Sequence, residues 1–509
     1  MAIVQPVDSI GGRRSLRLAN PATREDIGEI PVTSAAEVRT AVARARRVQP
    51  EWAARSFADR AKIMQRAVTI LRERQEHFIE VIRRETGRSH FETVMMEIFP
   101  ACDSLTYYAK NAEQILTDRR PGLHLLRTKK LLITYRPLGV VGIITPWNGP
   151  FILALNPSVQ ALMAGNAVIV KPSEVTPFSG ALVGELLREA GLPDGVFQVV
   201  PGDGETGAAL VDAGVDKISF TGSVATGQKV GAACGRNLIP CTLELGGKDA
   251  MIVCDDADLD RAAGGAVFGG FFNAGQFCCG TERVYVHEAV ADQFLDKVLA
   301  KTKALRQGTS GEYDVGPMIW PRQLDVIERH VADAVAKGAR ILCGGKRNTA
   351  IGELFYEPTV LVDVTHDMLV MTEETFGPIL PIVRVKDDDE AVRLANDSRY
   401  GLSGTVWSKR EERAIAIARR LETGSVCIND SSITYGAHEA PFGGRKASGV
   451  GQVNGEVGLK GYCHALPIVI DRFGQKEEHV WYPYTGAKEQ VLQRIIRWVW
   501  GTPVGRWMS

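Results

Sequence analysis

The residue best suited to covalent chemistry in this sequence is a cysteine in the segment 271–280, which reads FFNAGQFCCG. Cys278 follows a polar turn flanked by glycine. Such a turn leaves a side chain open to close approach by a substrate, as a nucleophilic thiolate requires. The alternative is a buried, inert cysteine. We therefore take Cys278 as the candidate nucleophile.

A thiolate nucleophile needs a base and a group that stabilises an oxyanion. No histidine lies in a motif typical of cysteine hydrolases, and no GxSxG serine motif occurs. Glu244 stands between two leucines and before two glycines, and apolar surroundings would raise its pKa toward the range of a general base. The alternative is an ion pair with Lys248. Asn148, in TPWNGP, could donate its amide to an oxyanion or could serve only as a turn residue.

Two glycine-containing turns could seat a phosphate. Gly204 lies in GDGETG, a dinucleotide-type pattern after a predicted strand and before a predicted helix. The acidic residue that should follow about twenty positions later is missing. The second turn holds Gly222 and Ser223, which would leave backbone N–H groups open at a helix N-terminus. Together the two turns favour a nucleotide cofactor over simple turn chemistry.

The segments around these residues predict parallel α/β architecture. Short apolar strands alternate with helical segments, which is typical of a doubly wound sheet covered on both faces. The first predicted strands lie at 139–144, 166–173, 196–200 and 217–223, and helices are expected near 157–164, 179–192 and 206–213. After residue 241 the same texture continues in a second α/β unit, with strands at 242–247, 249–254 and 283–287. Residues 34–87 read as surface helices with a break near Pro50.

Length and composition exclude several functional classes. The chain has 509 residues, enough for about three structural units. Its 60 Lys+Arg balance 60 Asp+Glu, so no global basic field favours nucleic acid. The nine cysteines are scattered without a CxxC pair, which argues against disulfides or a structural metal, and no metal is expected. The N-terminal sequence lacks a secretory pattern and no long apolar run occurs, so we expect a soluble, cytoplasmic protein.

Two further segments stand apart from this pattern. Residues 123–133, LHLLRTKKLLI, have apolar residues on both sides of a basic turn and predict a β-hairpin arm or an ordinary edge hairpin. Residues 473–509 form an aromatic, basic extension with an amphipathic segment. Such a helix could lie at a membrane interface, but packing on its own domain or on a partner subunit is the favoured interpretation.

Seven ordered motifs resemble those of the aldehyde dehydrogenase superfamily, the NAD(P)-dependent enzymes with a cysteine nucleophile. The resemblance covers nearly the whole chain, from Asn20 to about Asp471. The aromatic C-terminal extension of the chain is similar to that of a divergent branch of this superfamily. The motifs are TPWN at 145–148, KPSE at 171–174, FTGS at 220–223, LELGGK at 243–248, FNAGQFC at 272–278, EETFGP at 373–378 and PFGGRKASG at 441–449.

The resemblance implies roles for individual residues. Cys278 would be the nucleophile, Glu244 the general base, and Asn148 with the Cys278 backbone N–H the oxyanion hole. The cofactor NAD would be bound by Trp147, Lys171, Glu174, Gly204, Gly222, Ser223, Gly246, Glu374 and Phe376. The carboxylate of Glu174 favours NAD over NADP, because a 2′-phosphate would meet a like charge. The substrate pocket would be lined by Phe272, Phe277, Cys279 and Tyr435.

The expected reaction is oxidation of an apolar aliphatic or aromatic aldehyde to a carboxylic acid through a thiohemiacetal and a thioester. A semialdehyde such as succinic semialdehyde, and transfer of the acyl group to CoA, are the alternatives. The resemblance further implies a Rossmann-like cofactor domain, an α/β catalytic domain, and β-arms that join a homodimer or homotetramer. The predicted boundaries are 1–122 and 137–243 for the NAD-binding domain, 244–428 for the catalytic domain, 123–136 and 460–472 for the arms, 429–459 for a return to the NAD-binding domain with the substrate loop, and 473–509 for the extension.

Overall fold

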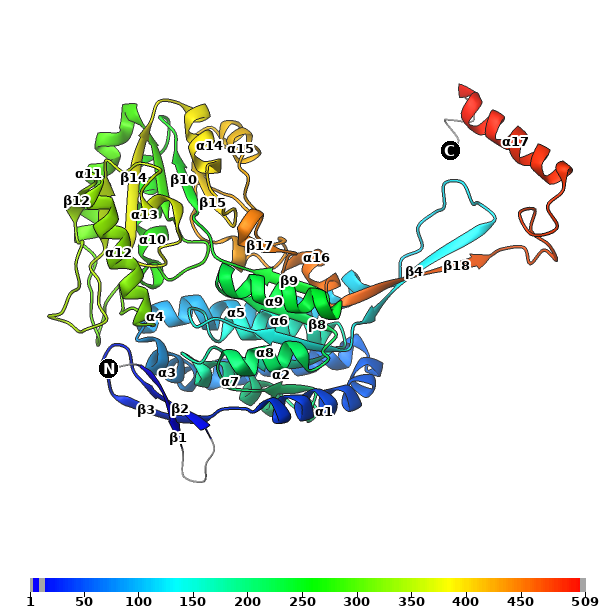
Figure 1. Ribbon diagram of the computed structural model, residues 1–509, viewed down its shortest axis with the longest axis horizontal. Coiled ribbons are helices and arrows are strands. Elements are labelled where there is room, and N and C mark those ends of the chain that lie inside the picture. The colour runs from blue at the N-terminus through cyan, green and yellow to red at the C-terminus, as the bar shows by residue number, and fades with distance from the viewer. Residues whose placement is uncertain (1–2, 9–13, 504–509) are drawn as a thin grey trace. The chain divides into compact units, whose positions relative to one another are not determined.

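A computed structural model describes residues 3–8 and 14–503 (Figure 1). The chain forms two compact units. The larger unit contains the chain up to Ile115 and Pro137–Tyr462, and the smaller one contains Leu116–Arg136 and the chain from Cys463 onward. The candidate catalytic and cofactor residues all belong to the larger unit.

A six-stranded sheet carries the first group of predicted strands, in the order β17-β9-β8-β5-β6-β7. Its strands are parallel except β17, which runs antiparallel to β9. They are β5 (Val140–Ile144), β6 (Ala167–Lys171), β7 (Phe197–Val199), β8 (Lys217–Thr221), β9 (Cys241–Glu244) and β17 (Gly449–Val450). The predicted doubly wound sheet is confirmed.

Helices cover both faces of this sheet. On one face, residues of α1 (Ala35–Ala54), α8 (Gly204–Asp212) and α9 (Val224–Asn237) join Val140, Ile218 and Leu243 in one apolar core. The helices α6 (Ile152–Met163) and α7 (Pro177–Glu189) pack on the strands as well. Every residue of α6 is buried, so this helix lies wholly inside the unit. Burial of these apolar side chains is the main favourable term holding the layers together.

A seven-stranded sheet follows, in the order β12-β13-β14-β11-β10-β15-β16, with only β12 antiparallel to its neighbour. Separate apolar cores lie against it. Its strands are β10 (Ala250–Val253), β11 (Arg283–His287), β12 (Arg340–Cys343), β13 (Thr359–Val362), β14 (Ile379–Val385), β15 (Gly404–Trp407) and β16 (Cys427–Ile428). Its helices are α10 (Leu259–Phe271), α11 (Ala291–Lys303), α12 (Arg322–Ala336), α13 (Leu369–Thr372), α14 (Asp388–Asn396) and α15 (Glu411–Ala418).

The N-terminal part is a small antiparallel sheet followed by helices. The sheet comprises β1 (Val4–Asp8), β2 (Arg14–Ala19) and β3 (Asp26–Pro31), and the helices after α1 are α2 (Phe57–Glu73), α3 (Gln75–Thr86), α4 (His90–Thr93) and α5 (Phe99–Leu116). The predicted break near Pro50 is wrong, because α1 continues through this proline to Ala54. The buried Trp52 donates its indole N–H to the Leu162 carbonyl (3.1 Å) and thereby holds the last turn.

The smaller unit holds a two-stranded sheet and a terminal helix. The strand β4 (Lys129–Pro137) pairs with β18 (Cys463–Asp471). The predicted hairpin within 123–133 is wrong, because residues 123–128 are not in a strand; β4 pairs with β18, and its Ile133 also forms an antiparallel bridge with Arg119. The amphipathic segment forms α17 (Gly486–Gly501). Within 3–8 and 14–503, no helix combines the length and apolar character needed to cross a membrane.

Candidate active site

One cavity of about 490 Å³ gathers most of the predicted catalytic and cofactor residues. Its walls come from the loop after β5, the turn between β8 and α9, the end of β9, and the segment 373–376. The first three lie at the carboxyl ends of parallel strands, which is where open α/β sheets bind ligands, and the segment 373–376 lies between α13 and β14. The predicted site residues that line it are Trp147, Asn148, Gly222, Ser223, Glu244, Gly246, Cys278, Glu374 and Phe376.

The residues that lead to the turn of Cys278 have an unusual backbone conformation. Asn273 and Ala274 both have positive φ (52° and 54°), and Gly275 follows with φ 73°. A Cβ at Gly275 would meet the Gly377 carbonyl oxygen at 2.1 Å, so only glycine fits there. The Cys279 thiol hydrogen-bonds to the Cys278 sulfur and lowers the pKa of the Cys278 thiol, while the same contact raises the pKa of Cys279. The turn therefore presents a thiol that ionises readily.

Glu244 ends β9 and is buried beside the same cavity, with only 5% of its surface exposed. In the described part of the chain, neither carboxylate oxygen has a hydrogen-bond partner. Burial raises the pKa of Glu244 well above its usual value, and the charge of Cys278 raises it further. The alternative ion pair with Lys248 is wrong, because the Lys248 ammonium instead pairs with Glu282 and donates to the Thr375 hydroxyl (3.0 Å). An unpaired buried carboxyl is the form expected of a general base.

Asn148 follows β5 and is also buried. Its side-chain amide donates to the Gln276 carbonyl (3.1 Å), two residues before Cys278. Gln276 is itself fixed, since its side chain donates to the Asn273 carbonyl (2.7 Å) and accepts from the Ile319 backbone N–H (2.8 Å). These bonds tie the amide of Asn148 to the turn that carries Cys278. The second amide hydrogen of Asn148 can serve a group bound next to Cys278.

The turn after β8 has the features of an anion site. Ser223 caps α9 by accepting from the Thr226 N–H (3.3 Å), and Gly222 precedes it. At Gly246 a Cβ would lie 2.2 Å from Glu374, whose carboxylate accepts from the Gly247 N–H (3.1 Å). This end of the cavity therefore combines a helix N-terminus, a glycine cradle and a carboxylate. These groups fit a dinucleotide, with its pyrophosphate near α9 and a ribose near Glu374.

Three predicted cofactor residues do not line the cavity. Lys171 and Glu174 form an ion pair (3.1 Å) at the end of β6, with Lys171 buried and Glu174 partly exposed. Gly204 opens α8, where Asp203 already caps the helix by accepting from the Glu205 N–H (3.0 Å). The GDGETG pattern therefore functions here as a capped helix start.

The predicted substrate residues form an aromatic group on the other side of Cys278. The rings of Phe272 and Phe277 meet edge to face, 5.1 Å apart. Phe277, Cys278 and Tyr435 pack against a small core that contains Cys279. Cys279 is buried and does not line the cavity. Phe272 lines a separate cavity of about 650 Å³. Cys278 thus lines the 490 Å³ cavity and also packs against the same small core as Phe277 and Tyr435.

Comparisons with known proteins assign this arrangement to a family. The model of the aldehyde dehydrogenase family matches residues 7–466. The chain belongs to this family. The resemblance predicted from the seven motifs is confirmed, and the protein is an oxidoreductase that acts on aldehydes with NAD(P).

Individual relatives cover this aldehyde dehydrogenase almost completely. A protein of Mycobacterium ulcerans named "Putative succinate-semialdehyde dehydrogenase [NADP(+)] 2" is 38% identical over 507 residues, which is 99% of this chain and 97% of the relative. The 4,4'-diapolycopene aldehyde oxidase of Methylomonas is 38% identical over 491 residues, 96% of this chain and 92% of the relative. An NAD-dependent aldehyde dehydrogenase from Sinorhizobium meliloti has a similar structure, with a TM-score of 0.88, 36% identity and coverage of 94% of each chain.

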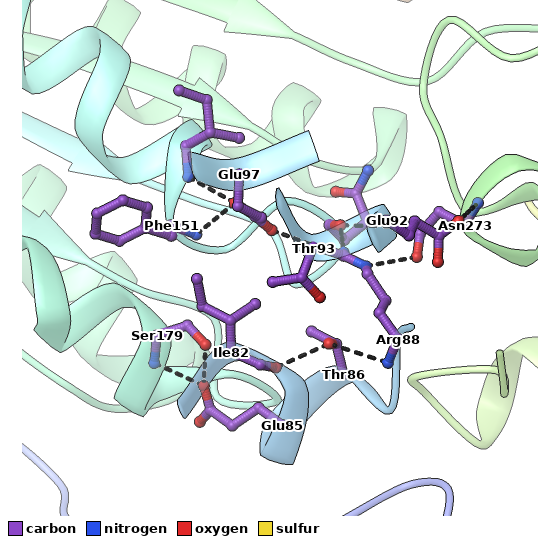
Figure 2. A network of polar contacts seen from close by, with 12 residues as sticks. Ile82, Glu85, Thr86, Arg88, Glu92, Thr93, Glu97, Phe151, Ser179 and Asn273 are labelled. Atoms are coloured by element: carbon purple, nitrogen blue, oxygen red, sulfur yellow. Dashed lines mark hydrogen bonds and ion pairs between the residues drawn. The ribbon is translucent and has the colours of Figure 1, made fainter. Parts of the chain in front are cut away.

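Sequence reasoning missed a buried polar network behind the turn that carries Cys278 (Figure 2). Arg88 is fully buried and binds three partners: the carboxylate of Glu97 (2.6 Å), the side-chain oxygen of Asn273 (2.7 Å) and the backbone carbonyl of Asn148. Glu92 accepts from the Asn273 N–H (2.5 Å). Arg88 therefore links Asn273, a left-handed residue five positions before Cys278, to the loop that carries Asn148.

Glu97 completes this network. It lies in a π-helical turn, Val94–Ile98, and accepts from the N–H groups of Phe151 (3.2 Å) and Ile152 (2.8 Å), where α6 begins. Burial raises the pKa values of Glu97 and of Glu92, the latter to about 7. π-Helical turns are frequent at functional sites. In the sequence Arg88 and Glu92 are four residues apart, like charged pairs on the exposed face of a helix, so no local signal separates these two from surface residues.

Proposed function

We propose that the protein oxidises an aldehyde to a carboxylic acid with NAD, through a thiohemiacetal and a thioester on Cys278. The observation that carries the proposal is the unpaired, buried carboxyl of Glu244 on the same cavity as Cys278. The Cys278 thiolate forms a bond to the aldehyde carbon, and the carbonyl oxygen becomes an oxyanion. The amide of Asn148 and the backbone N–H of Cys278 donate to this oxyanion. One such donor contributes about 3 to 4 kcal/mol to the transition state.

The cofactor supplies the hydride acceptor when bound. Gly222 and Ser223 would hold its pyrophosphate at α9, and Glu374 with Gly246 would hold the nicotinamide ribose. Trp147 and Phe376 enclose this end of the cavity, with ring centroids 5.5 Å apart at 90°. The preference for NAD is supported by the carboxylate of Glu174, although the Mycobacterium ulcerans relative is named for NADP.

Glu244 acts in the second half of the reaction. It takes a proton from water, the hydroxide oxygen bonds to the thioester carbon, and the C–S bond breaks to return the Cys278 thiolate. The raised pKa of Glu244 makes the carboxylate a stronger base than an exposed glutamate. The acid product leaves, and Glu244 must lose its proton before the next cycle.

The substrate class that the site favours is apolar aliphatic or aromatic aldehydes. Phe272, Phe277 and Tyr435 supply aromatic surface beside Cys278, and the loop 429–439 contains no arginine to bind a substrate carboxylate. The name of the Methylomonas relative, a diapolycopene aldehyde oxidase, is consistent with a large apolar substrate. The name of the Mycobacterium ulcerans relative favours succinic semialdehyde, which is the second candidate.

A screen of reduced-cofactor formation tests the proposal. The substrates are aliphatic aldehydes of increasing length, benzaldehydes and succinic semialdehyde, each with NAD and with NADP, and with and without CoA. We expect free carboxylic acid, no CoA requirement, and kcat/KM that rises with chain length. A clear preference for succinic semialdehyde would overturn the substrate class, and an acyl-CoA product would overturn the hydrolytic step.

We further propose that the six-stranded sheet belongs to the cofactor domain, with residues 244–428 as the catalytic domain. The strand β17, which follows the proposed catalytic domain in the sequence, lies in the six-stranded sheet and so supports a cofactor domain made of separate chain segments.

The paired strands β4 and β18 would join copies of the chain into a dimer or tetramer, and the extension at 473–509 would contact a partner subunit, the substrate entrance or a membrane. Deleting residues 476–509 should change chain-length preference or oligomer size. If neither changes, the partner and entrance roles are rejected.

A further inference from the structure

One face of the six-stranded sheet carries a row of buried polar side chains that leads away from Glu244. Side chains alternate between the faces of a strand, and paired residues of neighbouring strands share a face. Ser219 pairs with Thr242 and Thr221 with Glu244, so Lys217, Ser219, Thr242 and Glu244 point to the same side. All four are buried, with 4% to 6% of each exposed.

The opposite face of the same strands is apolar. Ile218, Phe220 and Leu243 belong to the core that α8 and α9 cover. Two strands that are buried on both faces would ordinarily be apolar throughout. The polar row is therefore a specific departure from what this sheet needs for packing.

Tyr462 lies over this row. Its ring centroid is 5.3 Å from the Lys217 ammonium nitrogen, and its backbone carbonyl accepts from the Asn166 amide (3.0 Å), which fixes its place. The Tyr462 hydroxyl is buried and, like both oxygens of Glu244, has no hydrogen-bond partner among residues 3–8 and 14–503. Burial raises the pKa of Tyr462 to about 12, with the neighbouring Ser219 side chain acting to lower it and the charge of Glu244 acting to raise it. Buried polar groups of this kind are normally satisfied by internal water.

Lys217 stands at the far end of the row. Its ammonium donates to the Thr242 hydroxyl (2.9 Å). Burial lowers the pKa of Lys217 to about 8, and the nearby thiols of Cys241 and Cys234 act in the opposite direction. The row reaches the surface just before β9, where the exposed Pro240 lies on the same face as Thr242. A lysine with this pKa exchanges its proton near neutral pH, which an exposed lysine does not.

We propose that this row is the proton exit of the active site, in which Tyr462 and Lys217 relay the proton that Glu244 takes from the hydrolytic water. The protonated Glu244 carboxyl gives its proton, directly or through water, to the Tyr462 oxygen as the phenolic proton moves on to the neutral amine of Lys217. The resulting ammonium releases its proton to solvent at the start of β9. No electrons are transferred, and Glu244 and Lys217 return to their starting states. The inference rests on the proposed role of Glu244 as the base.

The test separates formation of the acyl-enzyme from its hydrolysis. Tyr462→Phe and Lys217→Met are compared with the parent and with Tyr108→Phe. Tyr108 is a matched control because it is a buried tyrosine whose hydroxyl bonds to Asn454 (3.5 Å) and does not belong to the row. The burst of NADH reports acyl-enzyme formation, and rapid quenching of the labelled acyl-enzyme reports its hydrolysis as a function of pH and in D₂O.

We expect Tyr462→Phe and Lys217→Met to give an NADH burst of unchanged amplitude and to hydrolyse the acyl-enzyme about tenfold more slowly. In Lys217→Met the pH dependence of hydrolysis near pH 8 should also be lost. Hydrolysis at the parental rate with the parental pH profile in Tyr462→Phe would overturn the relay, whether or not Lys217→Met folds. Glu244→Gln in the same assay distinguishes the two claims. If Glu244→Gln turns over, the proposed function fails, whereas a stalled Glu244→Gln beside a normal Tyr462→Phe rejects only the relay.

Discussion

The buried network of Figure 2 makes a quantitative prediction about stability. Replacing Arg88 with methionine keeps the apolar length of the side chain but removes the ion pair to Glu97 and the hydrogen bonds to Asn273 and Asn148. Removing one partner of a buried ion pair typically costs about 3 to 5 kcal/mol, because the other charge is left uncompensated. Since folded proteins are stable by about 5 to 15 kcal/mol, Arg88→Met should lose a large share of the free energy of unfolding.

The assay is urea unfolding at fixed protein concentration, with Arg84→Met as the matched control. Arg84 is exposed and bonds only weakly to the Ile27 carbonyl (3.3 Å), so its loss should cost under about 1 kcal/mol. The double variant Arg88→Met/Glu97→Gln also removes the uncompensated charge of Glu97, so it should recover part of the lost free energy of unfolding. Because Arg88 holds both the Asn148 loop and the turn before Cys278, kcat/KM of Arg88→Met should also fall about 100-fold. An Arg88→Met protein as stable and as active as Arg84→Met would refute this reasoning.

Three further predictions concern the cofactor and the base. Glu174→Gln should raise kcat/KM with NADP relative to NAD about tenfold, measured by initial rates with each cofactor, because the like charge is removed; an unchanged ratio would argue against Glu174 as the discriminating residue. Gly246→Ala should raise KM for NAD about tenfold, since the new methyl group would displace Glu374; an unchanged KM would place the ribose elsewhere. Thioester hydrolysis should accelerate as pH rises through the raised pKa of Glu244, because the base works only when ionised, and this limb should be absent in Glu244→Gln.

The sequence predicted the parts of the structure that depend on local pattern. Continuous apolar runs such as 139–144 became buried parallel strands, because a strand covered on both faces needs apolar residues at every position. Glu244 was identifiable from an acid between leucines, and its lack of a partner in the described chain agrees with that interpretation. The sequence does not reveal that the polar residues of β8 and β9 share one face, because this depends on the register between the two strands.

The remaining features depend on contacts between distant segments. The predicted break in α1 at Pro50 failed because Trp52 holds the last turn through a bond to Leu162, more than a hundred residues away. The strand β4 pairs along its length with β18, and nothing local to 123–133 encodes that partner. Arg88 binds Asn273 and Asn148, which are 185 and 60 residues away in the sequence. A charged residue on a helical segment reads as exposed until its buried partners are known.

The proposed reaction requires a thioester on Cys278, which water hydrolyses with Glu244 as the base. The most direct test is a pre-steady-state measurement of NADH formation by Glu244→Gln. This substitution keeps the size of the side chain and removes its ability to accept a proton. We expect one equivalent of NADH per active site, followed by a stall with a stable acyl-enzyme on Cys278. Steady turnover at the parental rate, or no burst at all, would contradict it.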